Sequence, residues 1–276
     1  MEPLVVRKMW GSLEAYHGMI YFAPSAIEAY AALGITGRSG YFASRSAPMG
    51  AVPAEVVIAT FFNFDPALVT RAMAGVWATT TPAALVQARL DAADATLRSV
   101  LGPDVLAGAD MAEAAALARQ AATDLPLHGR PLFAGHASLP WPDEHHLVLW
   151  HAISLLREFR GDGHLAALTM AGLDGCEALV THAAAGDVPA SILQSSRGWS
   201  DADWAAAGQR LADRGLVDAG TGAFTDEGRA LRAEIEATTD RLAAAPWQAL
   251  GAEGCERLRA LAKPFSKAVM ASGVFG

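Results

Sequence analysis

The chain has 276 residues, of which 52% are hydrophobic but only 8% aromatic, because alanine supplies much of the apolar content. The formal net charge of −8 repels phosphate backbones overall and argues against non-specific binding of nucleic acid. Two cysteines are too few for a disulfide framework or a cysteine-based zinc site. Since no apolar run reaches the roughly 20 residues of a membrane span and no signal peptide is visible, we expect a cytoplasmic protein without a membrane partner.

Helical periodicity dominates the first part of the chain, as expected for segments rich in alanine. A loop rich in Gly, Ser and Pro is predicted over residues 36–50, with a short extended piece at Tyr41. Several prolines and capping residues predict helix starts. The expected helices are residues 4–20, 26–33, 53–62, 66–77, 82–101 and 111–123.

A connection punctuated by Pro and Gly ends near residue 141 and is the best candidate boundary between two domains, residues 1–140 and 141–276. The next long helix is expected over residues 145–160, followed by a break at Gly161-Asp162-Gly163. Asp162 is expected to cap the helix after this break. Beyond it the pattern predicts helices over residues 164–182, 189–195, 200–214, 226–245 and 252–263, with two very short strands within residues 215–224.

An internal repeat connects the two parts. The segment Gly50-Ala-Val-Pro53-Ala parallels Gly186-Asp-Val-Pro189-Ala, and other pairs of similar segments follow in the same order. The alternative is a chance alignment of two alanine-rich helical segments. The position of the Val-Pro-Ala segments and of the caps favours a duplication.

The second half resembles a known DNA-binding fold. A helix ending in "RGLV" at residues 214–217, a small wing, and "FTDEGRAL" at residues 224–231 occur in the order typical of the MarR-type winged helix-turn-helix. The chain also resembles an actinobacterial family of largely uncharacterised proteins through "YHGMIYFAP" (16–24), "AEVVIATFFNF" (54–64) and "LWHAISLLREFRGDGH" (149–164). These resemblances imply a mainly α fold of tandem winged-helix-like halves with small β-wings, a pseudo-dimer in one chain.

DNA recognition is not favoured by the charges of the expected recognition helix, residues 200–214. Its N-terminal end, which would enter the major groove first, carries Asp201 and Asp203. The wing has no basic residue, and the first-half counterpart, residues 65–77, offers only Arg71. Arg197, Arg210 and Arg214 are the cations through which DNA could still bind.

Histidines gather in the helix that opens the second half, but their spacing does not fit a metal site. His145 and His146 are adjacent, and His151 is five residues beyond His146, whereas aligned ligands on a helix are four apart. No metal is therefore predicted, and His17, His151 and His164 are only weak candidates. The sequence identifies no cofactor and leaves haem or a metal open.

A pocket between the halves is the candidate site, flanked by the break after Tyr21 and the break at residue 161. A histidine beside a carboxylate can act as an acid or base near neutral pH, so catalysis stays open. For each aromatic residue the alternative role is a core anchor. The candidate ligand-binding residues are Trp10, Tyr16, His17, Tyr21, Tyr41, Arg45, Trp150, His151, Arg157, Asp162 and His164.

The sequence thus predicts a small-molecule-binding protein, monomeric or homodimeric, derived from a MarR-like ancestor and largely without DNA recognition. The alternative is a MarR-like, ligand-responsive transcription regulator. A purely structural interaction module is the third hypothesis.

Overall fold

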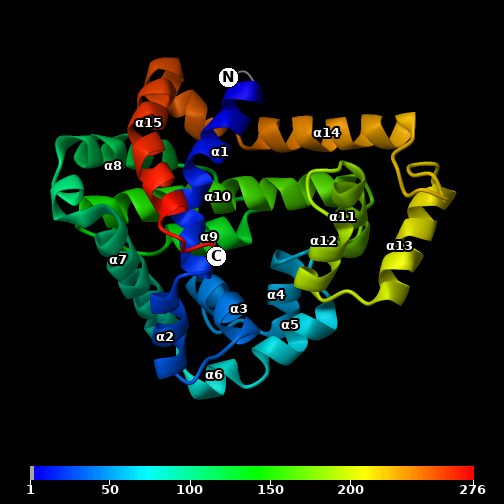
Figure 1. Ribbon diagram of the computed structural model, residues 1–276, viewed down its shortest axis with the longest axis horizontal. Coiled ribbons are helices and arrows are strands. Elements are labelled where there is room, and N and C mark those ends of the chain that lie inside the picture. The colour runs from blue at the N-terminus through cyan, green and yellow to red at the C-terminus, as the bar shows by residue number, and fades with distance from the viewer. Residues whose placement is uncertain (1–2) are drawn as a thin grey trace. The chain divides into compact units, whose positions relative to one another are not determined.

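The computed structural model describes residues 3–276, which form helices joined by short turns (Figure 1). Within these residues the only β pairing is an isolated antiparallel bridge between Val217 and Phe224. The prediction of a mainly α-helical protein is therefore confirmed. The two short strands expected within residues 215–224 do not form beyond this bridge.

Contacts divide the chain into two compact units. Unit 1 contains Met1–Val52, Gly75–Asp162 and Asp240–Gly276, and unit 2 contains Pro53–Ala74 and Gly163–Thr239. Neither unit is a contiguous half of the sequence. The sequence predicts that residues 1–140 and 141–276 are two halves that repeat the same order of elements along the chain. Grouping by contacts does not test that order, so the halves stay a prediction.

Unit 1 is a helical assembly in which α15 packs against both α1 and α8, and α2 packs against α7 (Figure 1). On α1, Met9, Leu13 and Tyr16 are buried at the spacing of one helical face. Its elements are α1 (Pro3–Gly18), η1 (Met19–Tyr21), α2 (Pro24–Ala32), α3 (Arg38–Ser46), η2 (Ala47–Met49), α6 (Val76–Thr79), α7 (Pro82–Leu106), α8 (Ala109–Ala122), α9 (Pro131–Ala137), α15 (Ala245–Ala271) and parts of α10 (His145–Met170) and α14 (Asp226–Leu242).

Two predictions of local structure are wrong. Residues 38–46 form α3 instead of a loop, because burial of a face that includes Phe42 and Arg45 outweighs the low helix propensity of Gly and Ser. Helix α10 continues through residues 161–163, since a glycine inside a helix costs only about 1 kcal/mol. Asp162 does not cap a following helix, because its carboxylate instead accepts from the backbone N–H of Phe133 at 2.9 Å, in the first turn of α9.

Unit 2 is built around a small core that contains Cys176, Leu211 and Ile235. Asp174 begins α11 with a capping box, in which its side chain accepts from the Glu177 N–H and the Glu177 side chain accepts from the Asp174 N–H. The elements of unit 2 are α4 (Ala54–Thr60), α5 (Pro66–Met73), α11 (Gly175–Ala184), α12 (Ala190–Arg197), α13 (Asp201–Asp213) and the remaining parts of α10 and α14.

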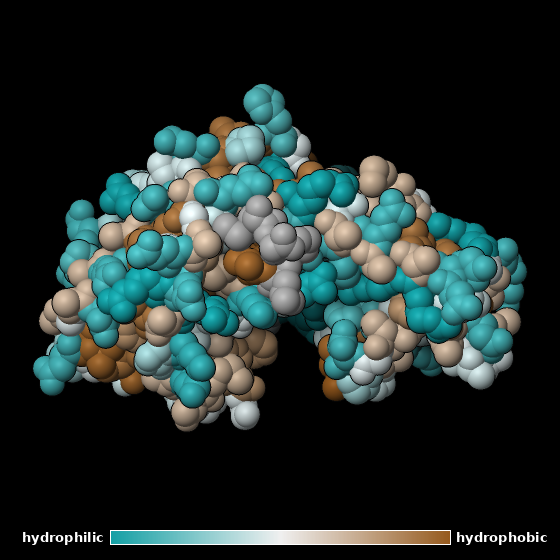
Figure 2. Space-filling model, turned by 90° about the horizontal axis from the view of Figure 1, so that it is seen from above, coloured by the Kyte–Doolittle hydropathy of each residue, from teal (hydrophilic) through white to brown (hydrophobic). Residues whose placement is uncertain are grey.

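Both cysteines, Cys176 and Cys255, are free and buried, as expected for small apolar fillers. Within residues 3–276, no helix combines the length and the apolar content needed to cross a bilayer. On the face drawn in Figure 2, hydrophobic residues lie in small separate patches among hydrophilic ones.

The close approach of α11 to the turn after α4 gives a stability prediction. A Cβ atom at Gly175 would overlap the carbonyl oxygen of Phe62, whereas one at Gly208 in α13 meets nothing within 4 Å. We expect Gly175→Ala to lower the free energy of unfolding by about 1–3 kcal/mol, because backbone has to move. Gly208→Ala should raise it by up to about 1 kcal/mol through helix propensity. Urea unfolding of both variants measures the difference, and equal effects would contradict this packing.

Candidate functional site

A chain of hydrogen bonds with a fixed direction runs through the interior of unit 1. The Ser154 hydroxyl donates to the carbonyl of Trp150 at 2.8 Å, so it accepts from Nδ1 of His17, also at 2.8 Å. Nε2 of His17 then accepts from the Tyr21 hydroxyl at 2.7 Å. His17 is fully buried and both of its ring nitrogens are engaged. Its proton is therefore held on Nδ1.

Three arginines surround the ring of Tyr21. The guanidinium carbons of Arg45, Arg89 and Arg157 lie 5.8, 5.3 and 5.4 Å from the centre of this ring. Such distances permit cation–π attraction. Burial, and after it the positive charges of these three arginines, lower the pKa of His17 well below its ordinary value. His17 is therefore neutral at physiological pH.

Two of the three arginines have carboxylate partners. Arg45 donates from Nε and Nη2 to the two carboxylate oxygens of Glu158 at 3.1 and 2.7 Å, and from Nη1 to the Tyr41 hydroxyl at 2.8 Å. Arg157 donates to Glu14 at 3.0 Å and to Glu158 at 3.4 Å. Burial alone would raise the pKa of Glu158, but the charges of Arg45 and Arg157 outweigh it and lower this pKa to about 2. Glu158 is therefore a buried, permanently ionised partner.

Arg89 on α7 has no carboxylate partner among the described residues. Its side chain is buried between the rings of Tyr21 and Trp150, each centred 5.3 Å from the guanidinium carbon. Nη2 makes one long hydrogen bond to the Tyr21 hydroxyl at 3.4 Å, while Nε and Nη1 are buried without an acceptor. Buried charges are costly unless they are paired. Arg89 is thus a cation that lacks its counter-charge.

A cavity of about 90 Å³ adjoins Arg89. Two further buried nitrogens of residues in its wall, the indole Nε1 of Trp150 and the imidazole Nε2 of His151, also have no hydrogen-bond partner. The rest of the wall is mostly apolar. The lining residues are Pro48, Val86, Gln87, Arg89, Leu90, His136, Leu139, Pro140, Pro142, Trp150 and His151.

The two histidines at this cavity are neutral. Burial lowers the pKa of His136 to about 3, and burial together with the charge of Arg119 lowers the pKa of His151 to about 4. Nε2 of His136 lies 3.3 Å from the carbonyl oxygen of Arg45, and the His151 ring packs edge-on against Trp141. At neutral pH they therefore offer hydrogen bonds, and the fixed charge of the cavity comes from Arg89.

The candidate residues from the sequence fall into two groups. His17, Tyr21, Tyr41, Arg45, Trp150, His151 and Arg157 form the cluster and its cavity. Trp10 lies under the guanidinium of Arg160, 4.9 Å from the ring centre, and lines a separate cavity of about 20 Å³ together with Arg157.

Tyr16, Asp162 and His164 make bonds that hold helices together. The buried Tyr16 hydroxyl donates to the carbonyl of His146 at 3.2 Å, and burial raises its pKa. Burial also raises the pKa of Asp162 to about 6, although the N–H of Phe133 opposes this. His164, in unit 2, is bonded through Nδ1 to the Thr239 hydroxyl at 2.9 Å. In residues 3–276 no group of three His, Cys, Asp or Glu side chains is arranged to hold a metal ion.

Arg89, Ser154 and Glu158 were missed by the sequence analysis. A signal for Arg89 exists, because Leu85 and Ala92 lie four residues before it and three after it, on the apolar face of an amphipathic helix. A charged residue on such a face needs a partner or a function. Ser154 and Glu158 carry no comparable signal.

Unit 2 contains two short helix–turn–helix segments, α4–α5 and α12–α13. Asp65 caps α5 by accepting from the N–H of Leu68 at 2.7 Å, and Ser200 caps α13 by accepting from the N–H of Asp203 at 3.1 Å. The two turns also contact each other. The N–H of Asp65 donates to the carbonyl of Arg197 at 2.9 Å.

The exposed face of α13 is acidic at its start, where Asp201 and Asp203 are exposed. Arg210 in α13 and Arg214, the residue after this helix, are both bonded to the segment 171–177, where α11 begins. Arg210 donates to Glu177 at 2.8 Å and to Asp174 at 2.5 Å, and Arg214 donates to the carbonyl of Gly172 at 2.9 Å.

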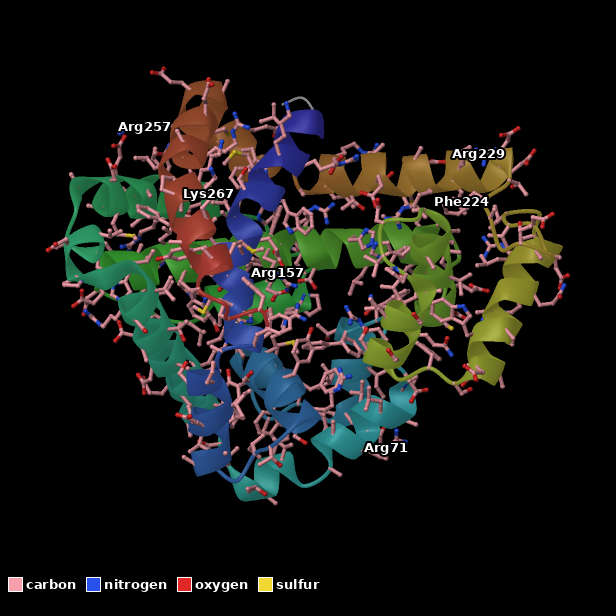
Figure 3. The ribbon with its side chains drawn as sticks, viewed as in Figure 1. Arg71, Arg157, Phe224, Arg229, Arg257 and Lys267 are labelled. Atoms are coloured by element: carbon pink, nitrogen blue, oxygen red, sulfur yellow. The ribbon has the colours of Figure 1, made fainter. Side chains whose placement is uncertain are left out.

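Other cations of unit 2 lie outside α13. Arg71 is exposed on α5, and Arg229, at the start of α14, donates to the carbonyl of Phe224 at 2.7 Å (Figure 3). Arg229 also pairs with Asp226. The bridge between Val217 and Phe224 lies where a wing would be. Arg229 contacts it, and Asp226 balances the charge of this arginine.

A family model described as a helix-turn-helix family matches residues 6–276. No curated protein and no solved structure matches the chain.

The buried pair Arg45–Glu158 gives a testable stability difference. We expect Arg45→Met to lower the free energy of unfolding by about 3–5 kcal/mol, because it leaves Glu158 ionised and unpaired. The double variant Arg45→Met/Glu158→Met should lose less than the single variant, since both charges are gone. Arg257→Met, which breaks the exposed pair with Glu113 at similar distances, is the control and should have little effect. Urea unfolding measures all three, and a double variant less stable than the single would contradict this account.

Proposed function

Because the chain belongs to a helix-turn-helix family, we propose that it uses this scaffold to bind a small molecule in the cavity beside Arg89. One observation carries the proposal: Arg89, Trp150 and His151 line a single cavity, and each has at least one buried side-chain nitrogen without a hydrogen-bond partner. Buried donors nearly always have acceptors in folded proteins. Four exceptions on three residues around one cavity are typical of a binding site that its ligand completes.

The state of His17 argues against a role for this residue as an acid or base in catalysis. His17 has both nitrogens committed, to Ser154 and Tyr21, and is fully buried. A general base needs a nitrogen within reach of the proton that it removes. We therefore assign His17 a positioning role, in which it holds the Tyr21 ring between the arginines.

The ancestry that we propose is a duplicated, MarR-like winged helix-turn-helix. The similar segments around Pro53 and Pro189 each precede a helix, α4 or α12, and a capped second helix follows each of them, α5 or α13. This parallel order supports a duplication into residues 1–140 and 141–276.

A second candidate function is a ligand-responsive, DNA-binding regulator. Membership of a helix-turn-helix family favours it, and α12–α13 has the required order of helix, turn and helix. The charges of α13 oppose it, since the arginines that would meet phosphates are bonded to Glu177, Asp174 and backbone carbonyls. For this reason it ranks second.

Native mass spectrometry of the protein purified from its host cells tests the ligand. We expect a species heavier than the bare chain, and this added mass should disappear on denaturation. Leu90→Trp, which fills the cavity, should abolish the adduct, while Ala95→Trp on the exposed side of α7 should retain it. A bare chain from cells, or an adduct that Leu90→Trp leaves unchanged, would contradict ligand binding in this cavity.

Mobility shift with the DNA upstream of the gene, at low salt, tests the second candidate. We expect no discrete complex, because α13 offers no free cation at its start. Asp201→Lys/Asp203→Lys should increase only a non-specific, salt-sensitive smear. A discrete, sequence-dependent band with the unmodified protein would favour the regulator instead.

A further inference from the structure

The charges around Tyr21 do not balance. Three guanidinium groups, those of Arg45, Arg89 and Arg157, meet only two carboxylates, those of Glu14 and Glu158 (Figure 3 labels Arg157). The three imidazoles packed against this cluster, His17, His136 and His151, are neutral because burial lowers their pKa. One positive charge is therefore in excess, and it resides on Arg89.

An apolar wall surrounds this excess charge. Side chains without polar atoms form most of the cavity lining, namely Pro48, Val86, Leu90, Leu139, Pro140 and Pro142. The volume of about 90 Å³ is room for roughly three water molecules. A doubly charged, strongly hydrated ion such as phosphate would find one compensating charge and few polar partners. A molecule with one negative charge on a short carbon chain would balance the charge of Arg89 and place its carbon chain against the apolar lining of the cavity.

The donors at the cavity also suit a carboxylate. A carboxylate has two oxygens with about four acceptor positions, and it has no donor that would need a partner. Nε and Nη1 of Arg89, Nε1 of Trp150 and Nε2 of His151 are the buried nitrogens of the lining residues that have no hydrogen-bond partner. The Tyr21 hydroxyl already donates its hydrogen bond to Nε2 of His17, so it does not compete with the cavity nitrogens for the carboxylate.

We propose that the cavity beside Arg89 binds a small organic monocarboxylate, with its carboxylate group at Arg89, Trp150 and His151 and its carbon chain against the apolar wall. This inference rests on the proposed function, because it names the ligand class of the same cavity. Arg89 is in this view a binding residue that is unfavourable for folding in the free protein. Residues that serve binding often reduce stability.

The test compares butanoate with butanamide, which has the same shape and no charge, on the full-length protein. Thermal unfolding and saturation-transfer NMR measure binding. We expect butanoate to bind and to raise the Tm, and we expect butanamide and inorganic phosphate to bind at least about ten-fold more weakly.

Arg89→Met should reduce butanoate affinity about ten- to a hundred-fold and leave the Tm of the free protein unchanged or raised. Arg98→Met, on the exposed side of the same helix, is the matched control and should bind butanoate as the unmodified protein does. A merely structural Arg89 would behave differently, because its replacement would lower the Tm of the free protein.

Three outcomes would overturn the inference. The first is equal binding of butanoate and butanamide, which would leave a small-molecule site without anion selectivity. The second is butanoate binding that Arg89→Met does not weaken. The third is the absence of binding by every straight-chain carboxylate from acetate to hexanoate. An added mass from cells that proves to be a neutral compound would contradict the carboxylate and still support the proposed function.

Discussion

The bidentate ion pair between Arg45 and Glu158 is the interaction on which the interior of unit 1 depends. It joins α3 to α10 and satisfies a carboxylate that has no access to water. Because Glu158 is shared between Arg45 and Arg157, no carboxylate is left for Arg89. The cluster that this pair stabilises therefore has one positive charge in excess, on Arg89 beside the cavity.

In unit 2 the charged side chains pair with one another in a different way. The arginines of α13 stabilise the start of α11, where Asp174 and Glu177 form a capping box. Because these arginine side chains bind groups of the protein itself, few cations of this helix-turn-helix remain to contact the phosphates of a nucleic acid. Family membership favours DNA binding, whereas the paired charges of α13 do not, and the ligand-binding role that we propose for unit 1 is compatible with both observations.

Sequence reasoning succeeded where the signal is local. Pro66 and Pro82 begin helices as predicted because proline suits the first turn, and Gly102, with a φ of 75°, ends the regular part of α7 where the pattern predicted. Helix α2 begins at Pro24, two residues before its predicted start. The predictions were wrong where contacts between residues distant in the sequence determine the local structure. At Gly161–Gly163 the helix α10 continues, and Asp162 accepts a hydrogen bond from α9. For the candidate site, local aromatic and histidine patterns suggested His17, Tyr21 and Trp150, which the structure places next to one another. That Arg89 has no carboxylate partner among the described residues can be learned only from the three-dimensional structure.

The hydrogen bond between Asp65 and Arg197 also limits how this chain could read an operator. It ties the start of α5 to the turn that precedes α13, and the three residues from Arg197 to Ser200 span at most about 11 Å. Dimeric helix-turn-helix proteins place their two reading helices about 34 Å apart, one turn of the double helix. The two motifs of one chain therefore cannot occupy successive half-sites, and a palindrome could be read only by two copies of the protein.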